Sequence, residues 1–70
     1  MTATVVAGED LHVGDTILDP VDGRTQHLIT DLAEHWHFIG DHARRAHDGT
    51  GWGATICDHH TYQRLTFSPS

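Results

Sequence analysis

Hydrophobic positions in this 70-residue chain form short runs that alternate with turn-forming glycine and aspartate residues. The three clearest turn signals are Val13-Gly14-Asp15, Asp22-Gly23 and Asp48-Gly49-Thr50-Gly51, and residues that favour strands follow each of them. Glycine adopts the positive φ that tight turns require, and aspartate hydrogen-bonds its own backbone there. The pattern therefore predicts a small meander of antiparallel strands.

The apolar and β-branched runs place the strands. We expect them at Ala3–Ala7, Thr16–Leu18, Arg24–Asp31, Ala43–His47, Trp52–Cys57 and Tyr62–Phe67. Residues 32–42 are the hardest to assign, since Leu32 and Trp36 have the i, i+4 spacing of a helical turn. The segment is short for an independent helix, so we predict extended or irregular structure, with a strand that continues past a bulge as an alternative.

The order of elements resembles small SH3-like barrels of the Tudor or KOW type. The resemblance rests on the entry Val13 to Ile17, the return Asp22-Gly23-Arg24, the hairpin from Asp48 to Trp52 and the one-turn element Asp58-His59-His60. It implies an all-β fold, a small SH3-like barrel of about five antiparallel strands with one short helical or 3-10 turn. We expect a single domain over residues 1–67 and a frayed end at 68–70.

The chain also looks like short open reading frames of actinobacterial phages. This resemblance implies a small acidic viral protein that binds and modulates a host protein. The aromatic cage of Tudor domains is not evident as a spaced set, so methyl-lysine recognition is not carried over to this chain.

The charge and composition of the chain narrow the classes of function that it can have. Ten Asp and Glu residues against four Arg residues and no Lys give a formal net charge of −6. Nucleic-acid binding, which depends on Lys and Arg, is therefore disfavoured. A lone cysteine, no signal-peptide pattern and no long apolar run predict a cytoplasmic protein, of a bacterial cell or a phage-infected host.

Eight histidines are unusual in so short a chain, and their protonation would move the formal charge from −6 to +2. His35 and His37 are the first candidate metal ligands, because residues two apart in a strand share a face. Further ligands would come from Asp41, His42, Cys57, His59 and His60. The alternative is that these histidines are solvated loop residues, since no fixed-spacing zinc signature is present. We therefore predict no cofactor, and a metal-binding protein or enzyme stands as an alternative function.

The function that we predict is a non-enzymatic protein-interaction module with an unidentified protein partner. Aromatic anchors are typical of protein interfaces, and the candidate binding residues are Trp36, Phe38, Trp52, Tyr62, Arg44 and Arg45. The aromatic residues are also candidates for the core. The second alternative function is a nucleic-acid-binding barrel with a basic patch. Adjacent strand residues point to opposite faces, so only one of the two arginines would join that patch. An exposed edge strand also predicts that the chain can pair with a second copy as a homodimer.

Overall fold

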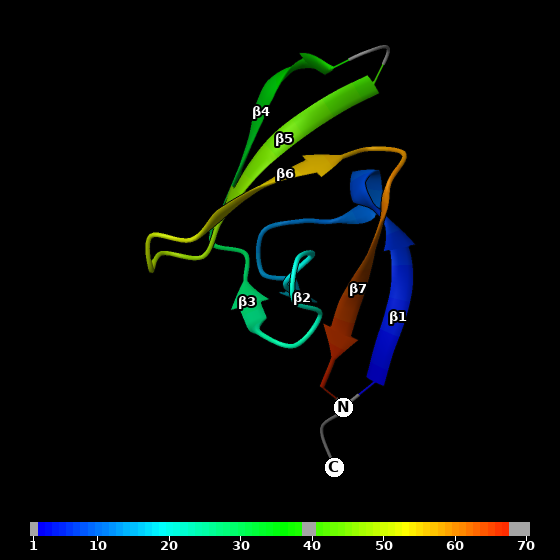
Figure 1. Ribbon diagram of the computed structural model, residues 1–70, viewed down its shortest axis with the longest axis vertical. Coiled ribbons are helices and arrows are strands. Elements are labelled where there is room, and N and C mark those ends of the chain that lie inside the picture. The colour runs from blue at the N-terminus through cyan, green and yellow to red at the C-terminus, as the bar shows by residue number, and fades with distance from the viewer. Residues whose placement is uncertain (1, 39–40, 68–70) are drawn as a thin grey trace.

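The chain folds into two antiparallel β-sheets (Figure 1). The computed structural model describes residues 2–38 and 41–67, and for 34–38 it describes the backbone alone. The elements in chain order are β1 (Thr2–Ala7), η1 (Gly8–Asp10), β2 (Thr16–Leu18), β3 (Gln26–Leu28), β4 (Asp31–Phe38), β5 (Asp41–His47), β6 (Gly53–Cys57) and β7 (Thr61–Thr66).

The first sheet has the strand order β1-β7-β2-β3, and the second has the order β4-β5-β6. β1 and β7 pair antiparallel from Thr2 opposite Thr66 to Ala7 opposite Thr61, so the first and last strands lie side by side. The described residues contain one 3-10 turn, η1, besides the strands. The predicted all-β class with antiparallel pairing is confirmed.

The predicted turns form where glycine and aspartate indicated them. Gly14, Gly23, Gly49 and Gly51 all have positive φ. The hairpin after Asp48 joins β5 to β6, from His47 opposite Gly53 to Ala43 opposite Cys57. The 3-10 turn lies at Gly8–Asp10, directly after β1. The Asp58–His60 segment is instead a hydrogen-bonded turn, closed by the His60 N–H and the Cys57 carbonyl.

The predicted strand from Arg24 to Asp31 is divided between the two sheets. The Ile29 N–H donates to the Asp15 carbonyl of the first sheet's entry loop, and the Thr30 N–H donates to the His47 carbonyl of the second sheet. The chain therefore changes sheets between β3 and β4. β4 then stays extended to Phe38, with a bulge between Glu34 and Trp36. The extended prediction for this segment holds as far as Phe38. Residues 2–38 and 41–67 contain seven strands, where about five were predicted.

Both sheets contribute to one hydrophobic core. Leu11, Ile17, Ile29, Ala46 and Ile56 are fully buried, and Val6, Leu32, Trp52 and Tyr62 pack against them while partly buried. None of the described residues belongs to a helix with the length and apolar character that crossing a bilayer requires.

Close packing of η1 on β6 depends on a glycine. A Cβ at Gly8 would lie 2.1 Å from the Cys57 carbonyl oxygen, a separation at which backbone must shift. The Gly8 N–H donates to the His60 carbonyl at 2.8 Å, which extends the β1–β7 ladder by one position.

Candidate functional site

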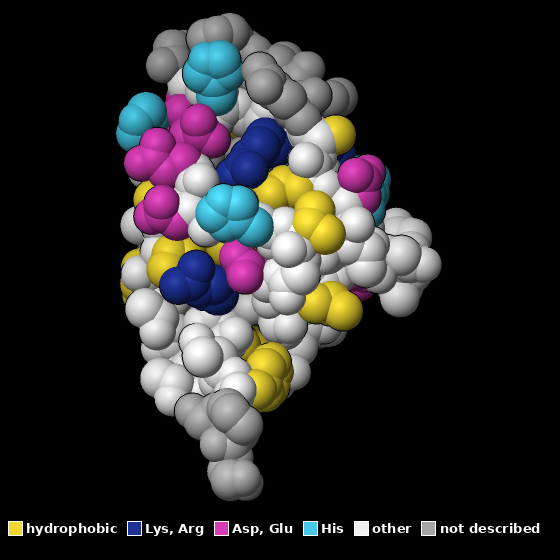
Figure 2. Space-filling view, turned by 180° about the vertical axis from the view of Figure 1, so that it is seen from behind, with side chains coloured by type: hydrophobic (Ala, Val, Ile, Leu, Met, Phe, Trp, Pro, Cys, Tyr) yellow, Lys and Arg dark blue, Asp and Glu magenta, His cyan; other side chains and the backbone are white. Residues whose placement is uncertain are grey.

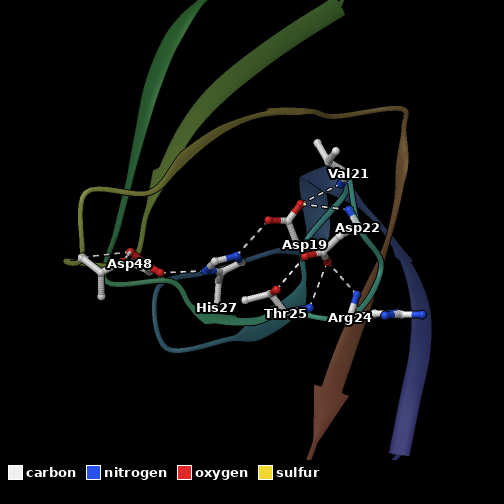
Figure 3. A network of polar contacts seen from close by, with 8 residues as sticks. Asp19, Val21, Asp22, Arg24, Thr25, His27 and Asp48 are labelled. Carbon is white, nitrogen blue, oxygen red and sulfur yellow. Dashed lines mark hydrogen bonds and ion pairs between the residues drawn. The ribbon is translucent and has the colours of Figure 1, made fainter.

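A buried histidine joins the two sheets. His27, at the centre of β3, is 7% exposed. Its Nδ1 lies 2.7 Å from Asp48 Oδ2 in the β5–β6 turn, and its Nε2 lies 3.0 Å from Asp19 Oδ2 just after β2 (Figure 3). The imidazole stacks on Trp52 with 3.8 Å between ring centroids and 5° between planes. We call these four residues the His27 clasp.

The two carboxylates favour the protonated form of the ring. Burial lowers the pKa of His27, but the hydrogen bonds to Asp48 and then Asp19 outweigh it and raise the pKa above 6.5. Hydrogen bonds from Thr50, and then from His27, lower the pKa of Asp48 to about 2. As imidazolium, His27 donates from both ring nitrogens and keeps no lone pair for a substrate or metal. The clasp is therefore a structural ion pair between the sheets.

Aspartate side chains order the β2–β3 loop, residues 19–25, from within. Asp19 Oδ1 accepts the Val21 N–H at 2.7 Å, which is the main reason that the pKa of Asp19 is lowered. Asp22 Oδ1 accepts the Thr25 N–H at 2.9 Å, and Oδ2 accepts the Thr25 hydroxyl at 2.6 Å (Figure 3). The Thr25 hydroxyl contributes most to lowering the pKa of Asp22 to about 2. The loop is thus held in one shape by local bonds, while Asp19 also ties it to His27.

This ordered loop forms one wall of a groove, and β1 and β7 form the other. The groove has a volume of about 280 Å³, which is small for a drug-sized ligand but enough for one or two side chains. It is lined by Val5, Leu18, Asp19, Pro20, Gly23, Thr61, Tyr62 and Gln63. We call it the loop groove.

The groove has a mixed lining, in which apolar side chains lie beside the polar groups of Asp19, Thr61 and Gln63. Val5 is 66% exposed beside it, and Val21, in the same loop, is 94% exposed. The Cys57 N–H donates to the Tyr62 hydroxyl oxygen at 2.9 Å, which fixes the phenol ring, and burial raises the pKa of Tyr62. A fixed wall with exposed apolar side chains is the kind of surface that binds with little ordering cost.

The candidate aromatic residues do not form one shared rim among the described residues. Trp52 is stacked in the His27 clasp, and Tyr62 lies in the loop groove. Both also pack against the core, as the alternative interpretation expected. The side chains of Trp36 and Phe38 lie outside the described part of the structure.

The two candidate arginines bind their own chain. Arg44 Nη2 donates to the Gly8 carbonyl, and Arg45 Nη1 donates to Thr55 Oγ1 at 3.2 Å. A hollow of about 220 Å³ beside Arg44 is also lined by Glu9, His42 and Asp58, so the charges there are mixed. Figure 2 shows one face of the molecule, on which acidic, histidine and hydrophobic side chains lie among the basic ones. This face has no uniform basic patch.

Only some of the candidate metal ligands that the structure describes lie close to one another. Asp41 Oδ1 lies 2.8 Å from His59 Nδ1, and Asp41 Oδ2 accepts the His59 N–H at 3.2 Å. Cys57 is buried, whereas His42 and His60 are exposed. Among residues 2–33 and 41–67, no three His, Cys, Asp or Glu side chains are grouped so as to hold a metal ion. The side chains of His35 and His37 fall outside this range.

Sequence reasoning missed His27 and the loop that it holds. In the sequence His27 stands next to the apolar pair Leu28 and Ile29, which suggests an exposed polar position. In the structure His27 is buried, whereas Leu28 is 51% exposed. A local signal for the loop was available, because Asp19 and Asp22 are spaced as in successive Asx turns before Thr25.

Comparison with known proteins gives no relative for this chain: no family model, no curated protein and no solved structure matches it. The resemblance to SH3-like barrels and to phage reading frames therefore stays a prediction. The function has to be inferred from the geometry of the chain itself.

Proposed function

We propose that the protein is a non-enzymatic protein-interaction module, and that an extended segment of its partner inserts apolar side chains into the loop groove. The observation that carries this proposal is the combination of a hollow lined in part by apolar side chains with a wall that is ordered before anything binds. Binding loops on a rigid scaffold are a common way to build recognition sites. Because the loop is already ordered, association need not bear the entropy of ordering it.

The arrangement of His27 and Cys57 supports binding over catalysis at these two side chains. His27 has both ring nitrogens engaged by carboxylates, and Cys57 is buried with its N–H bonded to Tyr62. A general base or a nucleophile must instead reach the substrate with a free lone pair or thiolate. Neither of these two side chains meets that requirement in this arrangement.

The chemistry of the groove suggests the chemistry of the partner. Val5, Leu18, Pro20 and the Tyr62 ring offer apolar contact, so the inserted side chains should be apolar. The formal net charge of −6 favours basic residues on either side of them. We therefore expect a partner segment with one or two apolar anchors and Lys or Arg flanks.

A display library of random linear peptides tests the proposal. Peptides enriched on the wild-type protein would be measured against Pro20→Lys, which places a charge in the groove, and against Val13→Lys. Val13 is 60% exposed and outside the groove, so Val13→Lys matches the charge change at a different site. We expect Pro20→Lys to weaken binding at least about tenfold, or about 1.4 kcal/mol, and Val13→Lys to have little effect. No enrichment, or equal binding by both variants, would overturn the proposal.

A further inference from the structure

β1 is the edge strand that nothing in the described structure protects. Natural sheets guard their edges with charges, short strands or covering elements. β3 has only three residues, β4 carries Asp31 and Glu34, and β6 lies against η1. β1, with the sequence Thr-Ala-Thr-Val-Val-Ala, has six residues, no charge and no proline. Figure 1 shows it on the outer side of the first sheet.

The ladder pattern identifies the polar groups of β1 that point outward. The Gly8 N–H bonds the His60 carbonyl, and Gly8 continues the register that pairs Ala7 with Thr61. In an antiparallel ladder, alternate residues direct both N–H and C=O to the same neighbour. The even-numbered residues of β1 therefore bond β7, and Ala3, Val5 and Ala7 direct theirs to the open edge.

We propose that two copies of the chain associate through β1, antiparallel and centred on Val5, so that their four-stranded sheets become one continuous sheet. A two-fold axis perpendicular to the sheet requires opposed residues to lie on the same face. With Val5 opposite Val5 of the second copy, Ala3 lies opposite Ala7 of that copy. All outward groups then pair, giving about six backbone hydrogen bonds. If the register between the two β1 strands were shifted by two residues in either direction, fewer of these outward N–H and C=O groups would be paired.

Charge does not oppose this arrangement at the interface. Glu9 lies in η1 beyond the end of β1, so the Glu9 residues of the two copies lie past opposite ends of a contact that already separates the two Ala7 residues by roughly 14 Å at 3.4 Å per residue. This exceeds the Debye length of about 8 Å at physiological salt. The contact covers Val5, which is 66% exposed in one chain. A chain this small gains from such added burial.

Sedimentation equilibrium tests the association and its register. We expect wild-type protein to dimerise between about 10 μM and about 1 mM, the range of weak interfaces. Val5→Lys should be monomeric, because two lysines would face each other at the axis, whereas Val13→Lys should dimerise like wild type. Val5→Asp should also be monomeric alone, but an equimolar mixture with Val5→Lys should form a heterodimer.

Three outcomes would overturn the inference: wild-type protein that stays monomeric throughout, a Val5→Lys variant that dimerises like wild type, or an equimolar mixture of Val5→Lys and Val5→Asp that stays monomeric. Circular dichroism would first establish that each variant is folded. Val5 also lines the loop groove, so the inference is told apart from the proposed function through Pro20, which lies in the groove but outside β1. Pro20→Lys should weaken peptide binding without changing the dimer.

Discussion

Replacing His27 with phenylalanine should destabilise the protein while it preserves the ring stacked on Trp52. The substitution removes two hydrogen bonds to carboxylates, of 2.7 and 3.0 Å. Hydrogen bonds to charged groups each contribute about 1.5–3 kcal/mol to stability. Because Asp19 and Asp48 keep some exposure and can regain water, we expect a net loss of about 3 kcal/mol in the free energy of unfolding near pH 6. That is a large share of the stability of a small domain.

The difference between His27→Phe and wild type should depend on pH in a defined direction. The pKa of His27 is raised in the folded state, so its contribution is complete below about 6.5 and is lost as pH rises through the folded pKa. The slope approaches about 1.4 kcal/mol per pH unit between the unfolded and folded pKa values. Asp19, Asp22 and Asp48 have lowered pKa values, so their contributions are present above about 3.8 and are lost as pH falls through the folded values. Stability should therefore be greatest between about pH 4 and about pH 6.5.

Urea unfolding followed by tryptophan fluorescence at about pH 6 and about pH 9 measures both effects. His12→Phe is the matched control, because the His12 side chain is exposed and the same atoms change. We expect this control to follow wild type at both pH values. A His27→Phe deficit below about 1 kcal/mol at pH 6, or a deficit that does not shrink at pH 9, would refute the view that carboxylates hold a charged His27.

Three further substitutions test the packing and the loop. Gly8→Ala should lower stability by about 3 kcal/mol or more in thermal unfolding, because its Cβ would lie 2.1 Å from the Cys57 carbonyl oxygen; an unchanged melting temperature would contradict the close approach. Ile56→Ala should cost about 2–5 kcal/mol in urea unfolding, since Ile56 is fully buried; a loss typical of surface positions would place it outside the core. Asp22→Ala should keep the fold but speed amide hydrogen exchange across residues 19–25, and unchanged exchange there would show that the loop does not depend on this carboxylate.

Local chemistry made much of the fold predictable. Gly23 and Gly49 adopt the positive φ that their turns require, and aspartate next to each bonds nearby backbone or side-chain groups. These bonds span two or three residues, so the sequence pattern contains all the information that they need. The β5–β6 hairpin was predictable for the same reason.

The features that the sequence pattern did not predict depend on pairing between residues that are far apart in the chain. The switch between sheets at Ile29 and Thr30 depends on carbonyls of Asp15 and His47, which the strand pattern alone does not identify. His27 is likewise buried by partners 8 and 21 residues away, and a lone histidine in a strand gives no sign of them. The loop groove arises only when the loop folds against β1 and β7, which are paired from opposite ends of the chain.

The most direct test of the interaction-module proposal is a ¹H–¹⁵N correlation titration of wild-type protein with the tightest peptide from the display selection. The account predicts that the largest shift changes fall on the amides of Val5, Leu18, Gly23 and Tyr62, which border the loop groove. Changes centred instead on Glu9, His42, Arg44 and Asp58, or on the β4–β5 hairpin, would contradict it.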